Sequence, residues 1–354
     1  MTELTIRPVD VDSDADLATW TAVVNAVDLF ERGEHATPWA LQEVTADLRA
    51  VRKDRRMDAH LALLDGEPVA AGLVELPLLD NLSAAEIGVW VLPEHRRRGH
   101  GSALLAVLEA AALAHGRTRY DAFTDWAYAG PEDGAGVPGV EFGRRHGYAF
   151  GLGNIQREAR LPVDADLLDR LAAGAAPHAA AYTLRSIVGR FPDGPGDEEL
   201  LVGYLSLAAR LFTEAPSGDL EVEDEAVDLE AFRASEEVLA AQGRTAVRTL
   251  AVAGDGEVAA YTDLVVPSAD TSAVFQWGTL VDPRHRGSRL GLAVKVANLI
   301  ALQERPDLGG GFAGRRLVTW NAEVNTHMIA INEVFGFVPV ARGGELQKKV
   351  SGAP

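Results

Sequence analysis

The chain has 354 residues, and its 33 Lys+Arg against 52 Asp+Glu give a formal net charge of 33 − 52 = −19. This charge disfavours nucleic acid and anionic lipid as partners, because like charges repel. An apolar share of 47% excludes disordered and collagen-like classes. Since there is no cysteine, disulfides, thiolate catalysis and cysteine-ligated zinc are excluded as well.

The sequence carries no targeting or membrane signal that we can identify. Residues 1–8 lack the basic and apolar regions of a signal peptide. The most apolar stretch, 103–114, is too short to span a membrane and contains Glu109. We therefore expect a cytoplasmic protein with about two domains. The histidines show no metal-ligand spacing, so we predict no metal site.

In chain order, a first strand over 4–7 is followed by a hairpin, because two strand-like runs (59–64 and 69–76) flank Asp65-Gly66. The same hairpin pattern surrounds Asp255, 190 positions later. Further pairs share this offset: Pro93 with Pro283, His95 with His285, Arg96 with Arg286, and Gly101 with Gly291. The repeat predicts a tandem duplication of one α/β module.

The predicted join lies where the composition changes. Residues 161–181 are rich in alanine and include Pro162, Gly174 and Pro177, which is typical of a short helix and a linker. Strand-like residues 182–185 match the first strand of the chain. We therefore predict an N-terminal domain over 1–160, a linker over 161–181 and a C-terminal domain over 182–354.

The segment 86–111 predicts a strand, an Arg/Gly-rich turn and a helix. Free N–H groups and the positive end of the helix dipole make such a turn an anion site, and arginines add charge. The turn suits a pyrophosphate; the alternative is a solvated basic turn that only caps the helix. The second copy repeats the pattern over 279–299.

Arg96-x-x-Gly99-x-Gly101, after Val89-Trp90-Val91-x-Pro93, resembles the coenzyme A signature of GNAT (GCN5-related) N-acetyltransferases. The whole chain resembles tandem GNAT proteins of the actinobacterial mycothiol synthase type. The resemblance implies an α/β (α+β layered) fold of two GNAT modules, each a mixed, mainly antiparallel sheet flanked by helices. It also implies acetyl-CoA, or another acyl-CoA, as cofactor.

The resemblance assigns cofactor-binding roles to residues in both copies. In the first copy they are Val89, Val91, Arg96, Arg97, Arg98, Gly99, His100, Gly101 and Ser102. In the second copy they are Leu280, Val281, Arg286, Gly287, Ser288, Arg289, Leu290, Gly291, Asn321 and Asn325. Arg289 departs from the pattern, because it stands where the middle glycine would be.

Many GNATs place a glutamate on the strand before the turn and a tyrosine in the last helix. The glutamate position falls on Glu86 in the first copy and on Gln276 in the second. The tyrosine position falls on Gly143 and on Asn332. Glu86 is the candidate base, or else a solvated carboxylate at a strand end, and Asn332 is the candidate to bond the thioester region. The resemblance favours the C-terminal copy as catalytic, whereas Glu86 and the intact turn favour the N-terminal copy.

We expect an acyl-CoA-dependent N-acyltransferase that acts on a small-molecule amine in a ternary complex. The acidic run over 219–230 suggests a cationic amine, although a solvated acidic helix start explains it better. One alternative is a catalytically silent acyl-CoA-binding or sensor protein. Another is a GNAT-fold transferase that uses aminoacyl-tRNA as donor, which the net charge disfavours. The oligomeric state stays open.

Overall fold

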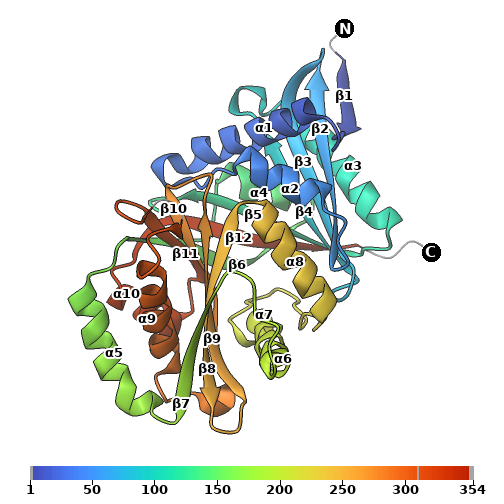
Figure 1. Ribbon diagram of the computed structural model, residues 1–354. Helices are drawn as coiled ribbons and strands as arrows, with labels where there is room; N and C mark the ends of the chain where they lie inside the picture. Colours follow the sequence, from blue (N-terminus) through green and yellow to red (C-terminus); the bar gives the residue numbers. More distant parts are fainter. Residues whose placement is uncertain (1–2, 309–310, 351–354) are drawn as a thin grey trace. The chain divides into compact units, whose positions relative to one another are not determined.

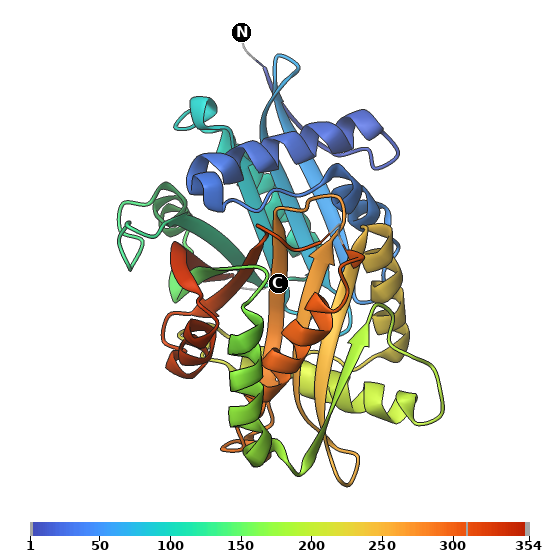
Figure 2. The ribbon, with the colours of Figure 1, turned by 60° about the vertical axis from the view of Figure 1, so that its left-hand side comes forward.

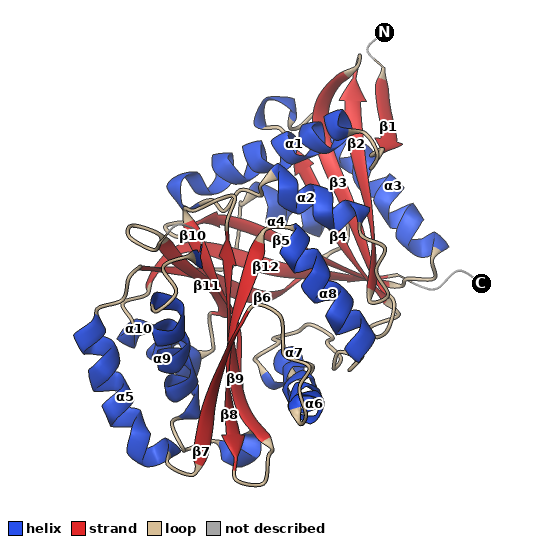
Figure 3. Cartoon of the chain, in the orientation of Figure 1, coloured by secondary structure: helices blue, strands red, loops and turns tan. Residues whose placement is uncertain are grey.

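Each copy of the repeat forms an open sheet with helices on both faces (Figures 1 and 3). The computed structural model describes residues 3–308 and 311–350. They form two compact units: unit 1 with residues 3–155, 217–223 and 340–350, and unit 2 with residues 156–216, 224–308 and 311–339. Among the residues within these ranges, no helix is long and apolar enough to cross a membrane.

The sheet of unit 1 has the strand order β1-β2-β3-β4-β5-β12. Its strands are β1 (Leu4–Pro8), β2 (Arg55–Leu64), β3 (Glu67–Pro77), β4 (Ala84–Val91), β5 (Arg119–Ala127) and β12 (Val338–Lys349). Its helices are α1 (Asp14–Arg32), η1 (Gly33–His35), α2 (Leu41–Arg49), η2 (Pro93–His95), α3 (His100–Ala114) and α4 (Pro138–Arg145). Neighbouring strands are antiparallel except β4 and β5, which are parallel.

The sheet of unit 2 has the corresponding order β6-β11-β10-β9-β8-β7. Its strands are β6 (Ala149–Arg160), β7 (Tyr182–Val188), β8 (Arg244–Ala253), β9 (Val258–Pro267), β10 (Ala273–Val281) and β11 (Arg316–Ala322). Its helices are α5 (Ala165–Ala179), α6 (Asp197–Ala208), α7 (Leu211–Glu214), α8 (Leu229–Ala241), η3 (Pro283–His285), α9 (Leu290–Gln303) and α10 (Thr326–Val334). Only β10 and β11 are parallel among its described pairs. These two mixed, mainly antiparallel sheets with flanking helices confirm the predicted fold class.

In unit 1, the two faces of the sheet are covered by different helices. Leu17 and Trp20 of α1 and Val44 of α2 pack on one face, against side chains that include Leu61. Leu104, Leu105 and Leu108 of α3 pack on the opposite face. A residue on β4 therefore points either toward α1 and α2 or toward α3, since side chains alternate along a strand.

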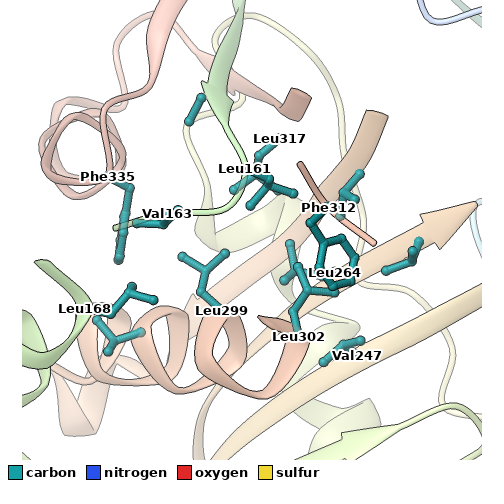
Figure 4. Packing of buried hydrophobic residues seen from close by; sticks show 14 of the residues in the cluster. Leu161, Val163, Leu168, Val247, Leu264, Leu299, Leu302, Phe312, Leu317 and Phe335 are labelled. Carbon is teal, nitrogen blue, oxygen red and sulfur yellow. The ribbon is translucent and has the colours of Figure 1, made fainter. Parts of the chain in front are cut away.

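In unit 2, α5 and α9 lie side by side on one face of the sheet (Figure 2). Leu168 of α5 and Leu299 and Leu302 of α9 share a core with Phe312 (Figure 4). Asp164 caps α5 by accepting a hydrogen bond from Leu167 N at 2.8 Å. Most of the predicted linker is therefore a helix that belongs to the core of unit 2.

The last strand of the chain belongs to the first unit. β12 pairs antiparallel with β5 from Ala341↔Ala127 to Lys349↔Arg119. Conversely, β6 lies next to β11, and its residues from Gln156 onward belong to unit 2. The two copies have exchanged their final strands, so the units differ from the sequential boundaries that we predicted.

Candidate active site

The parallel strands of each unit separate partway along their length. In unit 1, β4 and β5 pair from Ala84↔Arg119 to Glu86↔Asp121, although β4 continues to Val91. In unit 2, the pairing of β10 with β11 ends at Phe275↔Val318. Beyond these points, backbone N–H and C=O groups are left for another partner, and an extended ligand with amide groups can pair with them.

The turn after β4 leads into the N-terminus of α3. Gly99 has a φ of 90°, a left-handed conformation that glycine adopts without steric cost, and α3 begins at the next residue. The N–H groups of the first helical turn, at His100, Gly101 and Ser102, have no acceptor within the helix and attract anions. A Cβ on Gly101 would lie 3.1 Å from Val91 Cγ2, so glycine permits close packing here.

The arginines of this turn differ in what they contact. Arg97 and Arg98 are exposed, and no ion pair holds them among the residues that the structure describes. Arg96 points elsewhere: its Nη1 lies 2.6 Å from Glu31 Oε1, and its Nε donates to Val91 O at 3.1 Å. Burial and the neighbouring His95 and Arg98 charges lower the pKa of His100. Two positive charges are thus available to a pyrophosphate in unit 1.

In unit 2 the corresponding turn is paired with acidic side chains. Arg284 forms ion pairs with Asp282 and Glu257, and Arg286 lies 2.9 Å from Glu214. The hydrogen bonds from Arg284 and Arg210 hold the pKa of Asp282 well below its usual range. The charges of Arg284 and Arg286 are therefore compensated, and Arg289 is the exposed arginine of this described turn that no ion pair holds.

The left-handed positions of the two turns carry different residues. Gly287 has a φ of 90° where unit 1 has Arg97 with 62°, and Arg289 has 50° where unit 1 has Gly99. Ala293 N donates to Arg289 O at 3.0 Å, so α9 starts as α3 does. Helix α9 begins at Leu290, directly after Ser288 and Arg289. The N–H groups of Leu290 and Gly291 lie in its first turn and have no acceptor within the helix.

Glu86 lies at the point where β4 and β5 separate. Side chains alternate along a strand, so Glu86 points to the same face of the sheet as Trp90, four residues later. Trp90 packs against the core formed with α1 and α2, and Glu86 therefore points to that face. The residue is solvent-accessible, but desolvation by the surrounding protein and the charges of Glu75 and Asp121 raise its pKa to about 7. A carboxyl group with this pKa can exchange protons at neutral pH.

Further carboxylates share this face. Glu75 lies directly opposite Glu86, which lies opposite Asp121, and paired residues on adjacent strands point to one face. Gln347 Nε2 donates to Asp121 Oδ1 at 2.8 Å, and burial raises the pKa of both Asp121 and Glu345. The charges of Glu75, Asp121 and Glu345 oppose ionisation of Glu86, whereas Arg55, 3.1 Å from Glu75, favours it.

Gln276 does not occupy the place of Glu86 in unit 2. The register of β10 against β9 shifts between Gln276 and Thr279, which is a β-bulge. The last residue of the parallel pairing in β10 is Phe275, which is the position of Glu86 in β4. Gln276 is instead buried, and its Nε2 donates to Thr262 Oγ1 at 3.0 Å and to Asp263 O at 2.7 Å.

The position of the family's tyrosine is filled differently in each unit. A Cβ on Gly143 of α4 would lie 2.6 Å from Leu346 Cδ2, so a larger residue does not fit there without a shift. Asn332 of α10 is fully buried, and its Nδ2 donates to Asn321 Oδ1 at 2.6 Å. Asn325 caps α10 by accepting from Met328 N at 3.2 Å.

Sequence analysis missed Lys295 of α9. It is 3% exposed, its Nζ donates to Asn332 Oδ1 at 2.9 Å, and burial lowers its pKa to about 7. Lys295 is the only charged residue in the otherwise apolar sequence of α9. A single lysine in an apolar helix was the sequence feature that could have indicated a buried amine. Lys295, Asn332 and Asn321 form a series of hydrogen bonds inside unit 2. Asn332 and Asn321, two predicted site residues, are therefore bonded to each other through their side-chain amides.

The remaining predicted contacts lie on the strands. Val89 and Val91 pack toward α3, where the first-turn N–H groups are. In unit 2, Val281 packs with the start of α9, and Leu280 packs on the opposite face with α6. Among residues 3–308 and 311–350, no cluster of His, Cys, Asp or Glu is suited to hold a metal ion.

An extended thioester ligand with a pyrophosphate at its far end fits unit 1. A candidate base, a strand with free backbone groups, and an anion-binding helix end follow one another along residues 86–102. In acyl transfer from a coenzyme A thioester to an amine, the helix end can hold the pyrophosphate, the strand can pair with the extended arm, and the base can deprotonate the amine. The fold and the site thus define the class of protein, an acyl-CoA-dependent N-acetyltransferase.

Comparisons with known proteins agree. The acetyltransferase (GNAT) family model matches residues 23–125. Mycothiol acetyltransferase from Stackebrandtia nassauensis is 30% identical over 289 residues, which cover 80% of this chain and 83% of that protein. A tandem GNAT protein from the clavulanic acid biosynthesis pathway has a TM-score of 0.75 at 26% identity, covering 99% of this chain and 100% of that one.

A second similar structure supports the fold alone. The GCN5-related N-acetyltransferase from Sphaerobacter thermophilus has a TM-score of 0.61 at 15% identity, covering 98% of this chain and 95% of that one. The match with mycothiol acetyltransferase, in line with the family model, shows that the chain belongs to the GNAT family. It is a tandem GNAT protein and an N-acetyltransferase.

Proposed function

We propose that unit 1 transfers the acetyl group of acetyl-CoA to the amine of a small molecule, in a ternary complex, with Glu86 as the base. The observation that carries the proposal is the position of Glu86 at the separation of β4 and β5, with its pKa raised to about 7. The acceptor amine is protonated at neutral pH, so it needs a base of this kind before it can attack.

In this reaction, acetyl-CoA supplies an activated acetyl group as its thioester. The N–H groups of His100, Gly101 and Ser102 hold the pyrophosphate, and Arg97 and Arg98 add positive charge. The backbone of residues 87–91 pairs with the extended arm. Holding both substrates in place lowers the barrier by removing the entropy cost of their encounter.

Glu86 then takes a proton from the acceptor's ammonium group and releases it to solvent later. The amine lone pair forms the N–C bond to the acetyl carbon, and the C–S bond breaks with its electron pair on sulfur. The amide nitrogen loses one further proton, and the thiolate leaves with or without protonation. We propose no side chain as the acid, since Gly143 occupies the family's tyrosine position in this unit.

Comparison of the two units supports a structural role for unit 2. Arg284 and Arg286 of its turn are paired with Glu214, Glu257 and Asp282, which leaves Arg289 as the unpaired arginine of the described turn, and Phe275 stands at the position of Glu86. These features favour the N-terminal unit for catalysis, in contrast to the preference that the family resemblance suggested. The predicted roles of Asn321, Asn325 and Asn332 in a cofactor site of unit 2 stay predictions.

The acceptor that fits this site is a cationic amine. Glu75, Asp121 and Glu345 add negative charge around Glu86, which Arg55 partly offsets through its ion pair with Glu75, and this negative charge attracts an ammonium group. These three carboxylates belong to unit 1 and lie outside the acidic run over 219–230. A panel of diamines, amino sugars and aminoglycosides, compared with neutral aromatic amines, tests the preference.

Replacing Glu86 by glutamine tests the proposed base. We expect Glu86→Gln to lower the rate of thiol release with the best amine of the panel by about 10²- to 10⁴-fold. The affinity for acetyl-CoA should change little, because the cofactor binds to backbone groups and to the turn. Isothermal titration calorimetry measures that affinity, and a thiol-detecting assay measures turnover.

The pH profile gives the second half of the test. Because a base acts only when deprotonated, the wild-type rate at saturating acetyl-CoA should rise with pH through about 7 and then level off. In Glu86→Gln this limb should disappear. Glu141→Gln, at a half-buried carboxylate on α4, serves as the matched control and should keep the wild-type profile. A Glu86→Gln enzyme with the wild-type rate and profile would refute the proposal.

A further inference from the structure

The end of helix α1 contacts both strands that separate at the candidate site. Glu31 Oε1 lies 2.6 Å from Arg96 Nη1, and Arg96 opens the turn that follows β4. The next residue, Arg32, has its Nε 3.1 Å from Oδ2 of Asp125 on β5. Two consecutive side chains of α1 are therefore joined to the two sides of the opening between β4 and β5.

These contacts are partly or mostly buried and are reinforced by others. Arg96 Nε also donates to Val91 O, and its guanidinium lies 5.2 Å from the ring centroid of Phe30. The side chain of Arg32 is 7% exposed and also lies 2.5 Å from Asp28. Ion pairs shielded from water are stronger and more geometrically constrained than exposed ones.

Part of this arrangement recurs in unit 2. Arg286, which corresponds to Arg96, lies 2.9 Å from Glu214, the last residue of α7. Glu214 follows Leu211-Phe212, as Glu31 follows Leu29-Phe30, although the spacing to the acid differs by one residue. The pairing of Arg96, and of its counterpart Arg286, with a helix-end glutamate is thus present in both copies despite a change in local spacing.

We propose that Glu31, Arg32 and Arg96 are positioning residues that couple occupancy of the acetyl-CoA turn to the end of α1. This rests on the proposed function of unit 1. α1 covers the face of the sheet to which Glu86 points, whereas α3 and its anion-binding turn lie on the other face. The pair Glu31–Arg96 connects the two, so cofactor binding at the turn orders the helix end that borders the acceptor.

The proposal assigns Arg96 a different role from the one that the family motif suggested. A pyrophosphate ligand would act independently of Glu31, and removing Glu31 would then free the arginine for the anion. A positioning residue needs its partner, so loss of either side chain should have the same effect. This difference makes the two roles distinguishable by experiment.

The test compares Arg96→Gln, Glu31→Gln and wild type by amide hydrogen exchange, with and without acetyl-CoA. We expect acetyl-CoA to slow exchange in residues 24–33 of wild type, and this slowing to be lost equally in both variants. Acetyl-CoA affinity by calorimetry should change less than about 3-fold in each, which is within about 0.7 kcal/mol. The Michaelis constant for the amine should rise about 5- to 10-fold with kcat little changed, since the helix end borders the acceptor.

Two further variants serve as controls. Arg98→Gln should weaken acetyl-CoA binding yet keep the slowing in residues 24–33 at saturation. Glu214→Gln, in unit 2, should leave exchange in residues 24–33 unchanged. The reversed pair Glu31→Arg with Arg96→Glu should restore part of the slowing, which a variant that had merely lost its fold would not do.

Three outcomes would overturn the proposal. The first is 10-fold or greater loss of acetyl-CoA affinity in Arg96→Gln with none in Glu31→Gln, which would make Arg96 a pyrophosphate ligand. The second is wild-type binding of acetyl-CoA with no change in residues 24–33, and the third is unequal loss of slowing in the two variants. Failure of the proposed function is different: wild type would not bind acetyl-CoA, or Glu86→Gln would keep full activity.

Discussion

Arg289 adopts a left-handed backbone conformation, with a φ of 50°, immediately before α9. A side chain in this region crowds the following carbonyl, whereas glycine does not, and unit 1 has Gly99 at the same place. We predict that Arg289→Gly stabilises the protein by about 1 kcal/mol, because relief of strain exceeds the entropy cost of glycine in the unfolded chain. The free energy of unfolding in urea measures the effect.

The neighbouring Ser288→Gly is the control for that variant. Ser288 does not have a left-handed backbone conformation, so glycine at this position relieves no strain and only adds flexibility to the unfolded state. We expect a loss of about 0.5 kcal/mol. If both glycine variants destabilise the protein, Arg289 compensates its strain through contacts such as the one from its Nη1 to Gly174 O at 3.4 Å.

Lys295 makes stability depend on pH. Its pKa is lowered from 10.5 to about 7 in the folded state, so the unfolded chain binds more protons between these values and stability rises with pH there. Below about 7 the full cost of the buried charge is present. Above about 10.5 it has gone, because the amine is then neutral in both states.

We predict that Lys295→Met removes this dependence. Relative to the variant, wild type should gain about 1.4 kcal/mol of stability per pH unit between pH 7.5 and 9.5. Unfolding curves at several pH values test this, and the exposed Lys349→Met provides the control, which should keep the wild-type slope. Parallel wild-type and Lys295→Met curves would show that Lys295 keeps its charge when folded.

At the scale of strands and helices, sequence analysis succeeded where the pattern was local. The hairpin at Asp65, the turn after Pro93 and the helix α3 follow from residues that are close in the chain. The bulge in β10 was not predictable in this way. The connection from β9 to β10 spans 268–272 and is one residue shorter than the 78–83 connection in unit 1. The bulge adds one residue to β10 and compensates for this. The offset of 190 between the two copies is therefore the same before the connection and after the bulge.

The bulge matters because it changes which side chain reaches the site. A shift of one residue turns a side chain to the opposite face of a sheet, so Gln276 points inward to Thr262 while Phe275 takes the ladder position of Glu86. Counting residues from the proline therefore matched Glu86 with the wrong residue. The ion pairs of Arg96 and Arg286 were equally hidden, since their acidic partners are more than 60 positions away in the chain.

At the scale of the whole molecule, the exchange of β6 and β12 was also beyond sequence analysis. Both strands follow a helix and a Gly-aromatic pair, at Gly147-Tyr148 and Gly336-Phe337, so each suits either sheet. Backbone pairing carries little information about which of two equivalent edges a strand joins. The choice shows only in side-chain contacts, such as Lys348 Nζ with Glu109 Oε1 at 2.8 Å.

The exchange predicts that residues 1–160 do not fold as an independent domain. Without β12, the edge of β5 loses its backbone partners from Arg119 to Ala127, and the core loses the buried Leu346. Because a typical domain is stable by only about 5–15 kcal/mol, loss of a nine-residue edge pairing together with a buried leucine is enough to prevent stable folding. We expect the fragment to show no cooperative unfolding transition and rapid hydrogen exchange in β5.

A matched chain separates this explanation from simple loss of length. Residues 1–155 joined through a flexible Gly/Ser linker to 338–350 should recover a cooperative transition and slow exchange in β5, because the strand is returned to its edge. The Leu346→Ala version of that chain should be less stable by about 2–5 kcal/mol, since it leaves a cavity beside α3 and α4. Cooperative folding of 1–160 alone would show instead that β6 can replace β12 beside β5, and that the exchange is a choice made only in the full chain.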